Sequence, residues 1–222
     1  MSKVKNVYVV VEGHTEQTFI RDILAPYLYP KNIYLKASLI GKPGHKGGNV
    51  KFDRAQSDIV MFLKQRSDIY VSTMFDYFRL DTDWPGLRKT KKTSSALDNS
   101  EILERKTLRE IEKYYPDFNS GRFIPYFSMH EFEALLFSDS GVIAEKLSVK
   151  EKLILDIIEE CKEPEEINDE PETAPSKRIE KISGIKYKKT ITGIAIAKDV
   201  GIVEMRKKCP VFNLWLKKLE KL

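Results

Sequence analysis

The chain has 222 residues, of which 41% are hydrophobic and 32% charged, a composition that indicates a folded, soluble globular protein. No apolar run reaches the roughly 20 residues of a membrane span, and the basic start leads directly into an expected strand, so we expect neither a membrane helix nor a signal peptide. The net charge of +5 permits a nucleic-acid partner without requiring one. Cys161 and Cys209 form no metal-ligand spacing and no disulfide framework, which favours the cytoplasm.

The first part of the chain alternates between expected strands and expected helices. The expected strands cover residues 4–12, 33–39, 69–75 and 123–128. The helices between them cover residues 15–28, 52–66 and 100–114, and another begins in HEFEALLF. This alternation predicts an α/β fold with a mostly parallel four-stranded sheet flanked by helices.

The pattern changes beyond about residue 140. Helices are expected at 148–161, 175–184, 191–207 and 210–221, with an acidic loop at 163–176 between the first two. We therefore expect an α/β domain over residues 1–140 and a helical C-terminal region over residues 141–222 that packs on it.

Acidic residues end two of the expected strands. YVVVEGHTE places Glu12 at the end of the first strand, and the apolar run IYVSTMF ends at Asp76. The carboxyl ends of parallel strands meet at one edge of a sheet, which is where ligands bind in α/β proteins. Because hard cations prefer oxygen ligands, this pattern predicts a divalent-metal site, with Asp83 as a further candidate ligand. Glu16 is interpreted instead as a first-turn helix acid.

Further candidates lie near the same edge and in the C-terminal region. His130 and Glu131 stand where the fourth strand passes into a helix, and helix capping explains Glu131 as well as function does. HEFE lacks the H-E-x-x-H spacing of a zinc protease, and GKPGHKGG lacks the pattern of a P-loop. Candidate cations for a phosphate are Lys177, Arg178 and Lys198, each of which also fits a solvated face, while His14 could assist the site.

These residues resemble a Toprim domain, the metal-binding unit of topoisomerases, primases and overcoming-lysogenization-defect nucleases. That family carries a glutamate after its first strand, matched by Glu12, and an Asp-x-Asp after its third. Asp76 matches the first aspartate, but position 78 is Phe, and the Asp81-Thr82-Asp83 run comes five residues late. Asp83 or Glu131 would then replace the second aspartate.

The chain is also similar, over almost its whole length, to a bacterial family of unknown function with a Toprim-like core. The similarity is carried by VEGHTEQTF, FDYFRLDTDWPG, HEFEALLFSD, PSKRI and the segment from IAKDVG to CPVFNLWL. Members of that family are often encoded beside ABC- or SMC-like ATPases in loci linked to phage defence and abortive infection. The resemblance implies such an ATPase partner and a nuclease role.

The resemblance also implies a set of functional residues. Catalytic roles fall to Glu12, Asp76, Glu131, Lys177 and Lys198; metal binding to Glu12, Asp76 and Asp83; substrate binding to His14, His130 and Arg178.

The leading hypothesis is a Mg²⁺- or Mn²⁺-dependent phosphodiesterase that acts on DNA or RNA. Its substrate groove would be lined by the C-terminal tail and the basic run RKTKK at 88–92. A second hypothesis is a non-catalytic adaptor or sensor of the ATPase, which the broken Asp-x-Asp pattern favours. A phosphatase or nucleotidyl transferase with the same metal chemistry is a third.

Overall fold

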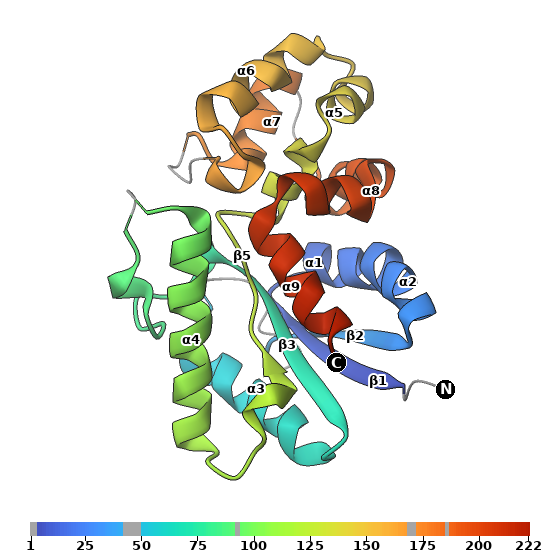
Figure 1. Ribbon diagram of the computed structural model, residues 1–222. Helices are drawn as coiled ribbons and strands as arrows, with labels where there is room; N and C mark the ends of the chain where they lie inside the picture. Colours follow the sequence, from blue (N-terminus) through green and yellow to red (C-terminus); the bar gives the residue numbers. More distant parts are fainter. Residues whose placement is uncertain (1–3, 42–49, 92–93, 168–171, 185–186) are drawn as a thin grey trace.

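The computed structural model describes residues 4–41, 50–91, 94–167, 172–184 and 187–222. Most of the Gly- and Lys-rich loop, with Lys42 and Lys46, lies outside these residues, as does Lys92 of the basic run. Within the described residues, five strands form a parallel sheet flanked by helices, which confirms the expected α/β class (Figure 1). The strand order is β2-β1-β3-β4, and β5 also pairs with β3.

The strands are β1 (Lys5–Val11), β2 (Ile33–Leu39), β3 (Ile69–Asp76), β4 (Phe123–Ile124) and β5 (Phe127–Ser128). The expected fourth strand is therefore divided in two, because Pro125 has no amide hydrogen for the ladder. Thr73 of β3 bridges the break: its Oγ1 donates to the Tyr126 carbonyl and accepts from the Tyr126 amide, both at 2.9 Å. Both short strands pair with β3, so the chain keeps its direction along the sheet.

The sheet is buried on both faces, because side chains alternate along its strands. Val7, Val9 and Val11 of β1 belong to one hydrophobic cluster and Val10 to a second one on the opposite face. The second cluster is covered by α3 (Phe52–Gln65) and α4 (Ala96–Tyr114). Helix α4 starts four residues before the expected position, because Ser95 accepts the Asp98 amide as its N-cap.

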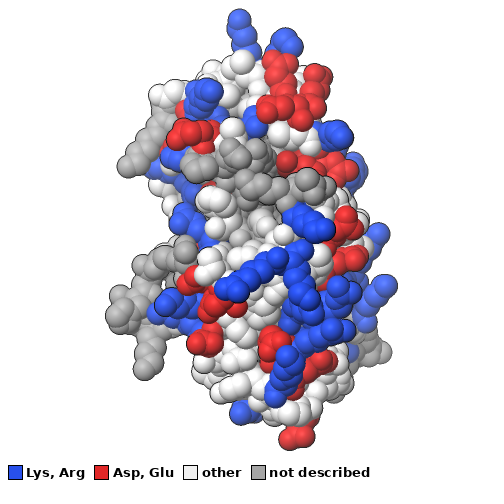
Figure 2. All heavy atoms as spheres, turned by 90° about the vertical axis from the view of Figure 1, so that its left-hand side faces the viewer, with Lys and Arg blue, Asp and Glu red and all other residues white. Residues whose placement is uncertain are grey.

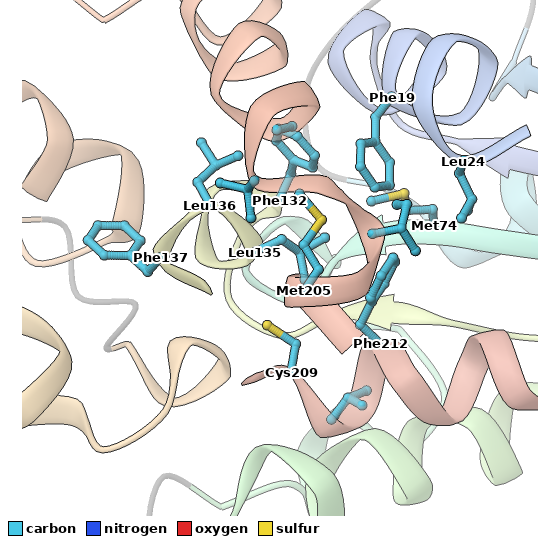
Figure 3. Close-up of a cluster of buried hydrophobic side chains, with 14 of the residues drawn as sticks. Phe19, Leu24, Met74, Phe132, Leu135, Leu136, Phe137, Met205, Cys209 and Phe212 are labelled. Atoms are coloured by element: carbon cyan, nitrogen blue, oxygen red, sulfur yellow. The ribbon is translucent and has the colours of Figure 1, made fainter. Parts of the chain in front are cut away.

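The other face is covered by helices from both ends of the chain. From the N-terminal part come α1 (His14–Phe19), the π-helical turn η1 (Ile20–Leu24) and α2 (Ala25–Leu28). From the C-terminal part come α8 (Ile194–Lys208) and α9 (Pro210–Glu220). Figure 3 shows Phe19 and Leu24 near Met74 of the sheet, with Met205 and Phe212 of the last two helices beside them.

The remaining helices form one end of the molecule beyond the carboxyl ends of the strands (Figure 1). They are α5 (Ser140–Leu147), α6 (Glu151–Cys161) and α7 (Pro175–Ser183). The helix expected at 148–161 is α6, which begins three residues later, and α5 is a separate helix before it. HEFEALLF forms a 3₁₀ segment, η6 (Phe132–Ser138), instead of an α-helix. No helix in the described part of the chain has the length and apolarity to cross a membrane.

Helix α9 is part of the sheet's own core. The Trp215 ring stacks on Tyr126 with ring centres 4.2 Å apart, and its Nε1 donates to Ser72 Oγ of β3 at 2.9 Å. The three side chains are fully buried. The expected boundary at residue 140 stays a prediction, but residues beyond 210 complete the core of the part that precedes it.

Candidate active site at the carboxyl edge of the sheet

Three adjacent strands bring acidic side chains to one edge of the sheet. Glu12 follows β1, Asp76 ends β3 and Glu131 follows β5 within three residues. Because β1 and β5 each pair in parallel with β3, the three carboxylates emerge at the same edge, as the sequence predicts.

Asp76 is buried, with 6% of its surface exposed. Its Oδ1 accepts a hydrogen bond from the Phe132 amide at 3.0 Å, which fixes the start of η6. Burial raises the pKa of Asp76 well above its ordinary value, and the charges of Glu16 and Glu12 raise it further. A carboxylate in this setting needs either a proton or a nearby cation.

Glu12 lies beside Asp76 and is partly open to solvent. Burial, with a contribution from the charge of Glu16, raises the pKa of Glu12 from its ordinary 4.5 to about 7. Its Oε1 lies 4.0 Å from Nε of Arg79, whose side chain is half exposed. Its Oε2 is buried and has no hydrogen-bond partner among the described residues.

Glu16 lies in the first turn of α1, which confirms its interpretation as a helix acid. It also belongs to the site. Its Oε2 accepts the Gly13 amide at 3.0 Å, which is one half of a capping box at the start of α1, because Gly13 has no side chain to return the bond. The side chain is nonetheless only 7% exposed, and burial raises its pKa.

Lys189 enters the cluster from the other side, in the π-helical turn η8 (Lys189–Gly193). Its Nζ lies 2.8 Å from Glu133 Oε2 and 3.2 Å from Glu131 Oε1. Although burial would lower the pKa of Lys189, the charges of Glu133 and Glu131 outweigh it and raise that pKa. Lys189 therefore keeps its positive charge inside the cluster.

The two glutamates that bind Lys189 differ in their surroundings. Burial opposes ionisation of Glu131, but the Lys189 charge and the Ser176 amide, 3.0 Å from Oε2, lower its pKa overall. The Glu131 side chain makes no cap bond to η6, the helix that the capping interpretation assigned to it, and instead caps the first turn of α7. Glu133 is fully buried, and burial raises its pKa to about 7.

The cluster holds more negative than positive groups. Around this edge, the described residues place five carboxyl groups and two cations together: Glu12, Glu16, Asp76, Glu131, Glu133, Arg79 and Lys189. The raised pKa values of Glu12 and Asp76 follow from burial and from this excess of negative charge. A bound cation would offset the excess negative charge.

The carboxylate edge contains a candidate pair of metal ligands but no larger set among the described residues. Among the described residues, no three His, Cys, Asp or Glu side chains are arranged to hold an ion. Mg²⁺ suits a smaller set, because it keeps several water ligands and binds through one or two carboxylates together with substrate phosphates. Glu12, with its unpartnered oxygen, and its neighbour Asp76 provide such a pair.

Asp83 does not extend this pair into a three-ligand site. It is exposed, in the turn before Trp84, and no described contact links it to the carboxylate cluster. The backbone explains its position: Leu80 forms a bridge with Val50, and Asp81 donates its amide to the Val50 carbonyl, so the chain leaves the edge after Arg79.

The predicted cations of the C-terminal region lie outside the cluster or have other partners. Lys177 is exposed and pairs with Glu180 at 2.8 Å, although Glu131 is near enough to contribute to its raised pKa. Arg178 pairs with Glu160 at 2.8 Å and donates to the Thr173 carbonyl. Lys198 is exposed on α8, where its charge acts on Asp22.

The two predicted histidines flank the edge. His14 is exposed at the start of α1, with Nδ1 3.2 Å from Gln17 Oε1. His130 adopts a left-handed backbone with a φ of 67°, and its ring meets the Tyr77 ring edge-on at 6.1 Å. A positive φ at a residue other than glycine is uncommon and often occurs at functional sites.

Sequence reasoning missed Lys189, Arg79 and Glu133. Lys189 is one of many lysines in the C-terminal region, and no local pattern separates it from the exposed ones. The position of Arg79 could have been predicted from the sequence, because it follows Asp76 by only three residues and so lies near the same strand end.

The fold and the site define an α/β protein with a cluster of carboxylates around a buried aspartate at the carboxyl edge of a parallel sheet. The family model described as "Domain of unknown function (DUF4276)" matches residues 11–220, and the chain belongs to that family. No curated protein and no solved structure matches the chain.

Proposed function

We propose that the protein is a divalent-metal-dependent phosphodiesterase that cleaves nucleic acid, in the manner of a Toprim nuclease. The observation that carries the proposal is the excess of buried carboxylates around Glu12 and Asp76, with an unpartnered Glu12 oxygen. The resemblance to Toprim proteins of phage-defence loci adds an ABC- or SMC-like ATPase as the partner, in the cytoplasm.

Glu12 and Asp76 would hold Mg²⁺ or Mn²⁺. Such an ion neutralises phosphate charge and lowers the pKa of water. Glu12, with a pKa of about 7, is suited to accept a proton near neutral pH. Arg79 is half exposed beside it and would bind an incoming phosphate.

Lys189 acts within the protein as a positioning residue. Its ammonium holds Glu131 and Glu133, and Glu131 in turn holds the first turn of α7 through the Ser176 amide. These bonds keep α7 and η8 against the strand ends, so the C-terminal helices form one wall of the site.

The adaptor hypothesis remains the second candidate, and the Lys189 ion pairs favour it. A lysine between two buried glutamates can hold two segments together without any catalysis. In that case the carboxylate edge would have no catalytic role and would form the surface on which the ATPase docks.

The test is cleavage of labelled single- and double-stranded DNA and RNA with Mn²⁺, by the unaltered protein and by the double variant Glu12→Gln/Asp76→Asn. Asn at position 76 keeps an oxygen for the Phe132 amide, so the variant removes charge and retains the fold. We expect metal-dependent cleavage that falls by at least about 100-fold in the variant.

The Asp83→Asn variant is the matched control, because Asp83 is exposed and apart from the cluster. We expect it to retain activity. Equal cleavage by all three proteins would show a contaminating nuclease. No cleavage, together with no Mg²⁺ binding by calorimetry, would replace the proposal with the adaptor.

A further inference from the structure

A second charged feature lies away from the carboxylate edge, on the outer face of α4 and the short helix η4 (Leu87–Lys89). The side chains of Lys89, Arg105, Lys106 and Arg109 gather there; we call them the α4 patch. Figure 2 faces the side of the molecule on which α4 lies and shows Lys and Arg side chains concentrated over its lower half.

The patch is built on a fixed surface. Trp84 is buried, and its Nε1 donates to Thr107 Oγ1 of α4 at 2.9 Å. Gly86 follows with a φ of 91°, and a Cβ there would come within 2.9 Å of the Lys106 Cβ. The loop that carries Lys89 therefore packs directly on α4.

The cations of the patch differ from several other exposed cations of the protein in having no acidic partner among the described residues. Arg21, Lys152 and Lys207 pair with Asp22, Asp156 and Glu204 respectively. In the described part of the chain, no carboxylate forms an ion pair with the patch cations. The charge of Lys89, followed by those of Arg109 and Arg105, lowers the pKa of Lys106, as expected for crowded like charges.

An apolar groove of about 650 Å³ lies beside the patch, between α4, β4 and α9. Its apolar lining includes Leu108, Phe123, Ile124 and Pro125. Lys221 is at its rim, and Lys218 spans it to pair with Glu104. Arg105 belongs both to the patch and to the groove, so the two are continuous across α4.

We propose that the α4 patch and this groove together bind single-stranded nucleic acid, with phosphates on the cations and a base in the groove. Arg105 and Arg109 are one helical turn apart, about 6 Å, a step comparable to the separation of neighbouring phosphates. A single strand binds through cations that contact its phosphates and through apolar side chains that contact its unstacked bases. The patch supplies the cations and the groove supplies the apolar side chains. An acidic protein segment would use the cations but not the groove.

The proposal shares a nucleic-acid partner with the proposed function but rests on other residues. It is tested by binding in EDTA, without cleavage. The probes are fluorescein-labelled DNA strands of about 30 nucleotides: one single, one in a duplex and one with base-free positions. Fluorescence anisotropy gives the dissociation constants at salt concentrations from about 50 to about 200 mM.

The test variant is Lys89→Ala/Lys106→Ala/Arg109→Ala. The matched control, Arg21→Ala/Lys152→Ala/Lys207→Ala, removes the same charge from paired, exposed sites. We expect the patch variant to bind the single strand at least about ten-fold more weakly, with a salt slope smaller by about 2, and the control to bind like the unaltered protein.

Each opposite result overturns the proposal. If both variants weaken binding equally, binding depends only on the net charge of the protein. If poly-glutamate at equal charge displaces the DNA strand, the patch is a general anion-binding surface. If duplex or base-free strands bind as tightly as the intact single strand, the groove does not bind a base. Patch-dependent binding with neither metal-dependent cleavage nor Mg²⁺ binding would refute the proposed function alone.

Discussion

Lys189 controls the charge balance of the carboxylate edge at the scale of single residues. It is held 2.8 Å from Glu133 and 3.2 Å from Glu131, both of them buried. Loss of one partner from a buried ion pair leaves the remaining charge without compensation, which costs more than loss of an exposed pair. The same reasoning separates Lys189 from Lys177, whose partner Glu180 is solvent-accessible.

We predict that Lys189→Met lowers the free energy of unfolding by about 1–3 kcal/mol at pH 7, less than the loss of a fully buried pair, because its side chain is 35% exposed. The physical reason is that Glu131 and Glu133 lose their shared cation. Lys177→Met is the control, with an expected change below about 0.5 kcal/mol. Urea unfolding followed by tryptophan fluorescence measures both values. Similar changes in the two variants would contradict the role assigned to Lys189.

One short turn connects distant helices at the scale of elements. The 3₁₀ turn η7 (Pro164–Glu166) lies in the acidic segment that the sequence assigns to a loop. Glu165 accepts the amides of Val211 and Phe212 at 2.7 and 2.9 Å, which caps α9. The neighbouring Glu166 accepts the Ala96 amide at the start of α4. Two helices on opposite faces of the sheet are thereby fixed to the same turn.

We predict that Glu165→Ala destabilises the protein by about 2 kcal/mol, because two buried amides at the start of α9 lose their acceptor. Glu163→Ala, in the exposed part of the same segment, should change stability by less than about 0.5 kcal/mol. Thermal unfolding of both variants measures the difference. An unchanged melting temperature in Glu165→Ala would show that the cap contributes nothing.

The position of α9 also tests the expected domain boundary. A protein limited to residues 1–140 would expose Tyr126 and the sheet face that Trp215, Leu216 and Leu219 cover. We predict that this fragment lacks cooperative thermal unfolding and that its amide NMR spectrum is poorly dispersed. A well-dispersed spectrum would instead establish residues 1–140 as an independent domain.

Buried acids dominate the response of the whole molecule to pH. The pKa values of Glu12 and Glu133 are raised to about 7 and that of Glu165 to about 8 by burial. The folded protein therefore holds more protons than the unfolded chain above the ordinary value of 4.5. Their contribution to stability is complete below that value and is lost as the pH rises through 7 to 8. Glu131 has the opposite sign, since its lowered pKa contributes above 4.5.

We predict a decrease in melting temperature of about 5–10 °C between pH 5 and pH 8 in EDTA at constant ionic strength. Mg²⁺ should reverse part of the decrease at pH 8 and have little effect at pH 5, because it binds the ionised forms of Glu12 and Asp76. Differential scanning calorimetry gives both values. The same Mg²⁺ effect in Glu12→Gln/Asp76→Asn would place the ion elsewhere.

Local sequence patterns predicted the strands, apart from the break at Pro125, together with their parallel arrangement and the edge at which Glu12, Asp76 and Glu131 meet. These features follow from local patterns: apolar runs set the strands, and parallel strands end at a common edge. Only the tertiary structure brought Lys189 to the carboxylates, paired Lys177 and Arg178 with other acids, and placed Trp215 on Tyr126. Such contacts depend on how segments far apart in the chain pack, and the identity of a single lysine carries no information about its distant partner.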